Sequence, residues 1–203
     1  MRTITALYDS YAAAKDAVES LEKSGVPSDH ISIISNKNGE QHGEGQGNSA
    51  AEGAGTGAGL GAVAGGAGGL LTGRGLLAIP GVGPVVAAGW LAATAAGTAA
   101  GAVVGAAAGG IVGAMIESGV SEEEAHVYAE GVRRGGAVVA AKVEEQEVAS
   151  SQAILRNPKS VDVAARRQAY SNEGWTRFDD AAEPYTTEQV NAERGRYQRN
   201  LLA

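Results

Sequence analysis

The sequence predicts an α+β fold: a small ferredoxin-like βαβ…αβαβ sandwich with an inserted Gly/Ala-rich helical hairpin. Two observations predict it. Strand-like alternation and capped amphipathic helices occupy both ends of the chain, and most of the 31 glycines gather between them. Aromatic residues make up only 4% of the chain, so we expect burial to come from closely packed small side chains.

The composition divides the chain into five parts. We expect a first α/β half at residues 1–36, a flexible polar linker at 37–52, a glycine-zipper helical hairpin at 53–118, a second α/β half at 119–164 and a polar tail at 165–203. The tail is expected to be partly disordered or to form a short helix.

The first half has the pattern of a β-α-β unit. Thr3 to Tyr8 alternate as in a strand, which places Ile4, Ala6 and Tyr8 on one face. Asp9 and Ser10 are good N-caps, and Tyr11 to Lys23 follow with helical spacing of apolar residues. The alternation of apolar residues along 30–35 predicts the second strand.

The second half opens with a capping box, in which Glu124 follows Ser121 by three residues and begins a helix through Arg134. This helix is additional to the ferredoxin-like order. The remaining predictions are a strand at Ala137–Val143, a helix at Glu145–Arg156 and a short strand at Ser160–Ala164. In the tail, Trp175 and Phe178 are candidates for docking onto the domain, and residues 187–202 for a helix.

Two rows of glycines recur at every fourth position of the insertion. Residues four apart share one helix face, and glycine there lets two helix backbones approach closely. Each glycine also destabilises an isolated helix by roughly 0.5–1 kcal/mol relative to alanine, so tight packing or lipid must compensate. Gly89 and Ala93 extend the second row backwards. The expected packing residues are Gly53, Gly57, Gly61, Gly65, Gly69, Gly97, Gly101, Gly105, Gly109 and Gly113.

The lengths of the two rows match a bilayer. Gly53 to Thr72 and Gly97 to Ile116 would each span about 30 Å as helices. Arg74 would lie near the far interface, and Trp90 at headgroup depth in a re-entrant or interfacial segment. Against insertion, the first span has few large apolar side chains, so a hairpin packed against protein in the cytoplasm stays open as the alternative.

No pattern indicates catalysis, a cofactor or a metal. The net charge of −7 argues against nucleic acid, and the chain has no cysteine. The start of the chain lacks a signal-peptide pattern, so we expect the α/β domain in the cytoplasm. The dinucleotide-like string at 57–62 follows a linker instead of a strand, and the three histidines lack metal-ligand spacing. Arg133 and Arg134 suit a helix C-terminus, or contact with anionic headgroups.

Four strings resemble one bacterial family. They are TALYD at 5–9, IPGVGPVVAAGWLAA at 79–93, AHVYAEGVRRGG at 125–136 and GWTRFD at 174–179. Together they resemble the heat-induced stress protein YflT family of general stress proteins and its low-temperature-induced relatives, from Met1 to about Asp179. The resemblance implies a bacterial stress-response protein and supplies no catalytic residues.

These observations predict a non-enzymatic general stress-response protein. Its glycine hairpin would attach it to a lipid bilayer and pack copies of the chain together into a homo-oligomer. The alternative is a cytoplasmic assembly protein that multimerises through the same rows, and a ligand-sensing regulatory domain is the third possibility.

Overall fold

The computed structural model describes residues 1–37, 75–100 and 110–200. The elements in this part of the chain are β1 (Arg2–Tyr8), α1 (Tyr11–Lys23), η1 (Ser28–His30), β2 (Ile31–Asn36), β3 (Gly75–Ile79), β4 (Gly83–Ala88), α4 (Trp90–Ala100), α5 (Gly110–Glu117), α6 (Glu122–Arg133), β5 (Ala137–Val143), η2 (Glu145–Glu147), α7 (Val148–Leu155), α8 (Val163–Asn172) and α9 (Thr187–Asn200).

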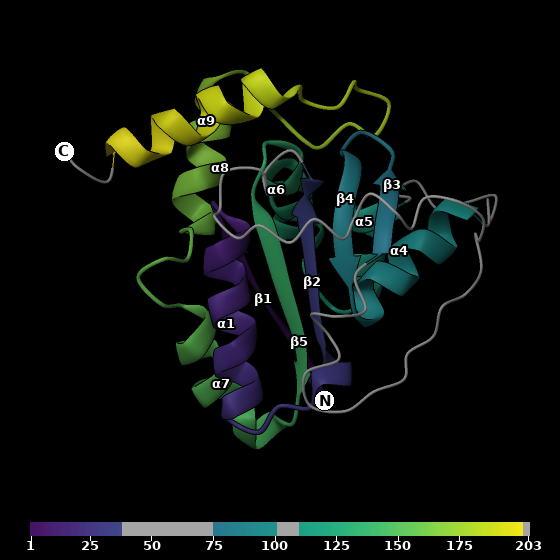
Figure 1. Cartoon of the computed structure of the whole chain (residues 1–203), viewed down its shortest axis with the longest axis vertical. Coiled ribbons are helices and arrows are strands. Elements are labelled where there is room, and N and C mark those ends of the chain that lie inside the picture. The colour runs from purple at the N-terminus through teal and green to yellow at the C-terminus, as the bar shows by residue number, and fades with distance from the viewer. Residues whose placement is uncertain (38–74, 101–109, 201–203) are drawn as a thin grey trace, which may run out of the picture.

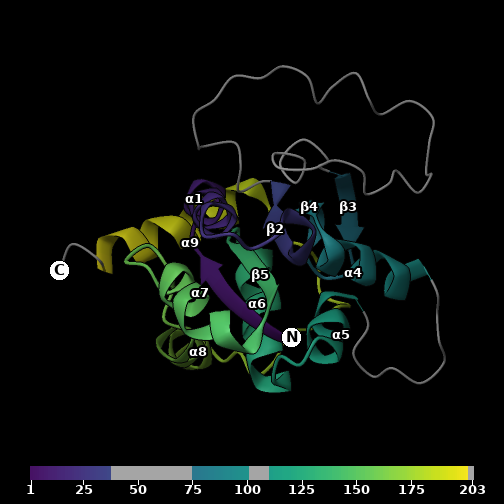
Figure 2. The same ribbon diagram turned by 90° about the horizontal axis from the view of Figure 1, so that it is seen from below.

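The described strands form one antiparallel five-stranded sheet in the order β1-β5-β2-β4-β3. The long strand β5 joins the two halves of the chain, because it pairs with β1 on one side and with β2 on the other. The α+β class is therefore confirmed. Helices cover both sides of the sheet, with α1 on one side and α6 on the other (Figures 1 and 2).

Each face of the sheet has its own apolar cluster. On one face, alternate residues of β1, β2 and β5 pack against α1 and α7, with Ile4, Ala6 and Tyr8 among them as predicted. On the other face, Leu7, Ile34 and residues of β4 and β5 pack against α4, α5 and α6. Alternation along each strand explains this division, because successive side chains point to opposite faces.

The caps confirm the predicted helix starts. The Ser10 hydroxyl accepts a hydrogen bond from the amide of Ala13 at the start of α1. The Ser121 hydroxyl does the same for the amide of Glu124 at the start of α6. Both serines satisfy backbone donors that have no partner within the first turn of a helix.

The fourth predicted strand is wrong. In place of a strand at Ser160–Ala164, a single bridge joins Ser160 to Tyr8, and the amide of Val161 donates to the carbonyl of Leu7. The chain turns away because the Asp162 side chain accepts from the amide of Ala165 and begins α8. The ferredoxin-like arrangement is thus incomplete at this edge, and β4 and β3 extend the sheet at the other.

The insertion also departs from the prediction. Residues 75–88, expected within a helical hairpin, form the β3–β4 hairpin instead. Two apolar runs flank a tight turn in which the amide of Val82 donates to the carbonyl of Ile79. Pro80 followed by Gly81, whose φ is +73°, suits a type II turn. Most of the predicted linker 37–52 and the first glycine row lie outside the described residues.

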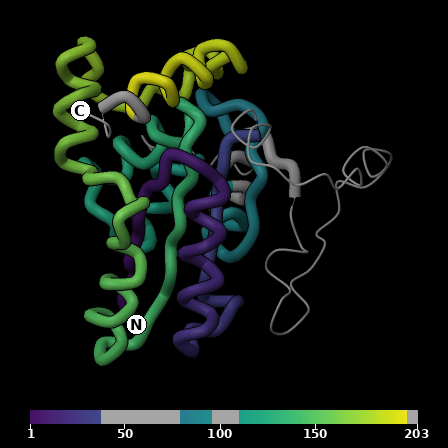
Figure 3. Tube along the Cα trace, turned by 60° about the vertical axis from the view of Figure 1, so that its left-hand side comes forward, coloured from purple at the N-terminus to yellow at the C-terminus, as the bar shows by residue number. Residues whose placement is uncertain are grey.

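The tail is more ordered than expected. Helix α9 confirms the predicted helix near residue 187, and Phe178 is buried against the core as predicted. The chain between α8 and α9 crosses one end of the sheet (Figure 3).

Candidate functional site

The candidate site is the surface formed by α4 and α5, where the described part of the second glycine row lies. Contacts between β2 and the start of α4 fix the position of this surface. The Ser32 hydroxyl donates to the carbonyl of Ala88 at 2.8 Å and accepts from the amide of Leu91 at 3.1 Å. Gly89 sits so close to β2 that a Cβ there would lie 2.8 Å from the Cα of Ser32. A buried serine therefore caps α4 from a neighbouring strand.

The two sides of α4 differ in the size of their side chains. Leu91 and Ala95 are buried against the sheet and α5. On the outward side Ala93 is exposed, whereas Gly89, expected in the same row, lies against β2 before the helix begins. Helix α5 packs against α4 and α6, and its Gly113 is half-buried. The small exposed side chain of Ala93 leaves room for another helix to approach this part of α4 closely.

A groove of about 430 Å³ lies beside this surface. The indole Nε1 of Trp90 donates to the carbonyl of His30 at 3.0 Å, and the ammonium of Lys142 lies 3.9 Å from the centre of the indole ring. Such a cation–π contact fixes the ring against the end of β5. The groove is lined by Met1, Arg2, Thr3, Trp90, Thr94, Glu117, Ser118 and Lys142.

The structure places only part of the predicted packing rows. Gly97 lies in α4 and Gly113 in α5. A single helix from Gly97 to Ile116 is wrong, because α4 and α5 pack against each other and Gly110 has a φ of +66°. A continuous helix cannot return along itself. The following predicted residues lie outside the described part: Gly53, Gly57, Gly61, Gly65, Gly69, Arg74, Gly101, Gly105 and Gly109.

The predicted headgroup contacts do not lie together. Trp90 packs near Lys142 at the end of β5, whereas Arg134 lies just before the start of that strand. Arg134 is only 7% exposed, and its Nε donates to the buried carboxylate of Glu130 at 2.7 Å. The guanidinium of Arg134 is thus bound by carboxylates of the protein itself, although we expected it to contact an anionic lipid headgroup. Burial by itself lowers the pKa of Arg134, but hydrogen bonds to Glu173 and Glu130 raise it above its usual value.

Arg133 is engaged as well. Its Nη2 donates to the carbonyl of Glu183 at 2.9 Å, and its guanidinium lies 5.0 Å from the ring centre of Tyr185. Both arginines therefore attach the C-terminal chain to the end of α6.

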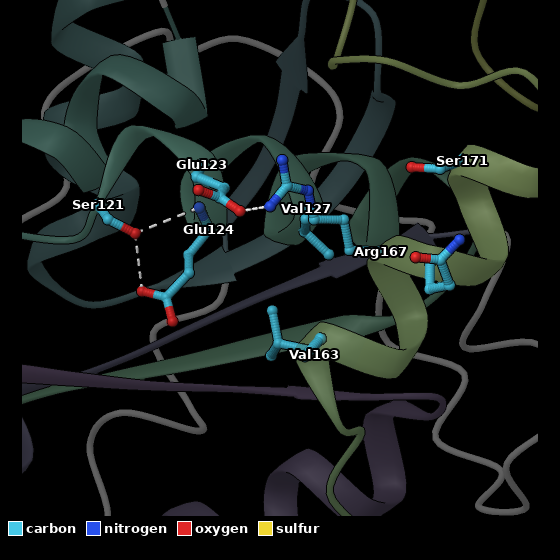
Figure 4. A pocket seen from close by; sticks show the side chains of 9 residues that line it. Ser121, Glu123, Glu124, Val127, Val163, Arg167 and Ser171 are labelled. Atoms are coloured by element: carbon cyan, nitrogen blue, oxygen red, sulfur yellow. Dashed lines mark hydrogen bonds and ion pairs between the residues drawn. The ribbon is translucent and has the colours of Figure 1, made fainter.

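A second groove, of about 630 Å³, separates α6 from α8 (Figure 4). Four of its polar residues pair with one another: the Ser121 hydroxyl donates to Glu124 at 3.0 Å, and Arg167 forms an ion pair with Glu123. Val127 and Val163 add apolar contacts. The arrangement offers no aligned nucleophile and base, so the groove has no evident chemistry.

Three further titratable side chains, His126, Tyr128 and Tyr8, lie on α6 and β1. His126 lies 3.9 Å from Glu122, one helical turn away. Burial raises the pKa of both Tyr8 and Tyr128, which lie in the core. Within residues 1–37, 75–100 and 110–200, no group of three or more His, Cys, Asp or Glu side chains could hold a metal ion. Nor is any described helix long and apolar enough to cross a bilayer.

Sequence reasoning missed Ser32 and Lys142. A serine between isoleucines in a buried strand was a visible irregularity, because buried hydroxyls need partners. Its partner at the start of α4 depends on the pairing of β2 with β4, which the sequence did not reveal. The contact of Lys142 with Trp90 likewise requires two elements that are far apart in the chain.

Comparison with known proteins gives one match. Residues 3–78 match the family model of the heat induced stress protein YflT domain, which covers β1, α1, β2 and most of β3. No curated protein and no solved structure matches the chain. The predicted resemblance is confirmed for these residues, and its expected extension to Asp179 lies outside the matched range. This match to the heat induced stress protein YflT domain over residues 3–78 supports a role in the general stress response.

Proposed function

We propose that this chain is a non-enzymatic general stress-response protein that associates with copies of itself through the outward surface of α4 and α5. The observation that carries the proposal is the exposure of Ala93, a small residue of a helix that is fixed to the sheet. Helix faces made of small residues allow backbones to approach closely and gain dispersion contacts. In the sequence the four-residue spacing continues through Gly101 and Gly105.

The first test enlarges this surface. Ala93→Leu adds an exposed side chain without disturbing the core, because Ala93 points away from it. Light scattering coupled to gel filtration should show a lower mass for this variant than for the wild-type protein. Ala12→Leu on α1 makes the same change at another exposed alanine, and should leave the mass unchanged. Equal masses for all three proteins would contradict the proposal.

The second test addresses the glycine row itself. Gly101→Leu with Gly105→Leu should abolish association. The matched control is Ala99→Leu with Ala107→Leu, two alanines that each lie two residues along the sequence from a row position. If the control lowers the mass as much as the row variant, the row is not the contact.

A lipid bilayer is the alternative partner for the same spacing. Cell fractionation followed by a carbonate wash distinguishes the two. A protein that associates only with its own copies is recovered in the supernatant as an oligomer, whereas an inserted hairpin stays with the membrane. Retention in the membrane of the wild-type protein, but not of the row variant, would replace self-association by membrane attachment as the function of the row.

A further inference from the structure

The chain after α8 lies on two turns at one end of the sheet (Figures 1 and 3). Phe178 is buried over the β3–β4 turn, where a methyl group at Gly81 would lie 2.6 Å from the carbonyl oxygen of Asp179. Val190 is fully buried and packs directly on Gly135 in the α6–β5 turn. Neither glycine has room for a side chain, so the C-terminal segment packs closely against both turns.

This segment has few apolar anchors. Within residues 173–197, the buried residues are Phe178, Val190 and Glu193, and one of these three is charged. Fixing a chain costs conformational entropy at every residue, and two buried apolar side chains offset little of that cost. Polar and charged contacts must therefore provide much of the attachment.

Arg134 is the centre of those contacts. Its Nη1 donates to Glu173 at 2.7 Å and to Glu193 at 3.2 Å, and its guanidinium lies 4.1 Å from the ring centre of Tyr170. Arg196 bridges the same two carboxylates from the solvent side, at 2.6 and 3.0 Å. The network links the C-terminal segment to the last turn of α6.

We propose that residues 173–197 form a releasable strap that opens as a unit while the sheet stays folded. Opening returns Glu173, Glu193 and the Nη1 group of Arg134 to water, so the desolvation cost of pairing these groups is recovered as the contacts break. A segment held in this way opens at a lower free energy than the core strands do. Release uncovers the β3–β4 turn. The proposal does not depend on self-association, because the hydrogen bonds of Arg134 to the strap involve no residue of α4 or α5.

Hydrogen exchange followed by mass spectrometry on the full chain tests the strap. In the wild-type protein, amides of residues 178–197 should exchange faster than those of β5. Glu193→Gln weakens a charged hydrogen bond to Arg134 without changing the size of the side chain, so strap amides should exchange about tenfold faster or more. The amides of β1 and β5 should keep their wild-type rates.

Two further variants complete the test. Glu173→Gln removes the second carboxylate charge facing Arg134 and should also accelerate exchange in the strap. Glu188→Gln makes the same chemical change on the exposed side of α9, and should leave exchange as in the wild-type protein. Equal acceleration in β5 and in the strap would mean that the segment unfolds only with the whole domain. That result, or unchanged exchange in both Arg134-facing variants, would overturn the proposal.

Discussion

Replacing Arg134 by methionine should destabilise the protein strongly, because Glu130 then loses its closest partner. Glu130 is 1% exposed, and the Nε of Arg134 lies 2.7 Å from one of its oxygens. Removing one member of a buried ion pair costs about 3–5 kcal/mol. Arg133 stays 3.5 Å from the other oxygen of Glu130, so we expect the lower end, about 3 kcal/mol.

Urea unfolding measures this loss. With a slope of about 2 kcal/mol per M, the midpoint should fall by roughly 1.5 M in Arg134→Met. The double variant Arg134→Met with Glu130→Met should recover about half of the loss or more, because no buried charge is left without its partner. Lys23→Met is the control at an exposed pair with Glu19, and should change the midpoint little. A loss below about 1 kcal/mol in Arg134→Met, or a double variant no more stable than the single one, would refute the reasoning.

Three further changes have definite expected outcomes. Ser32→Ala should cost about 1–3 kcal/mol and release the start of α4, which hydrogen exchange at Leu91 reports, since the hydroxyl bonds both Ala88 and Leu91. Tyr8→Phe should lower stability by about 1–2 kcal/mol in urea unfolding, because its buried hydroxyl donates to a carbonyl at 2.7 Å. Burial raises the pKa of Tyr197 from 10.0 to about 12, so the folded protein keeps a proton that the unfolded chain loses. Stability should therefore fall as the pH rises from about 10 to about 12, and equal urea midpoints at about pH 9 and about pH 11 would contradict this.

The elements with strong local sequence patterns were predicted most accurately. The bounds of α1 at Tyr11–Lys23 and β5 at Ala137–Val143 agree with the structure, and β1 and α6 agree to within a residue at each end. In each helix a serine N-cap, confirmed by its hydrogen bond, marked the start. Local preference and tertiary packing agree at these places, so the prediction did not depend on knowing the sheet.

The β3–β4 hairpin was missed although its turn was visible. Pro80 and Gly81 stand between two apolar runs, a pattern typical of a hairpin. The surrounding glycines and alanines instead favoured a helical interpretation. In a segment made mostly of glycine and alanine, a short apolar run fits the pattern of a strand and that of a helix equally well. The network around Arg134 could not be predicted either. It joins residues at the C-terminal ends of α6 and α8 to a residue of α9, and the sequence does not specify how those helices meet.

The two-sided core determines how the proposed surfaces can be tested. Helices α4 and α5 contribute to the cluster on one face of the sheet, whereas α1 and α7 form the other with Tyr8 and Leu155. The strap touches the end of the sheet through Gly81 and Gly135. Ala93 takes no part in the hydrogen bonds between Arg134 and the strap, and the effects of changes at sites without shared partners add. If Ala93→Leu and Glu193→Gln together shift mass and strap exchange by the sum of their separate effects, association and strap opening are distinct properties. A combined effect well beyond that sum would show instead that the strap controls association through the β3–β4 hairpin.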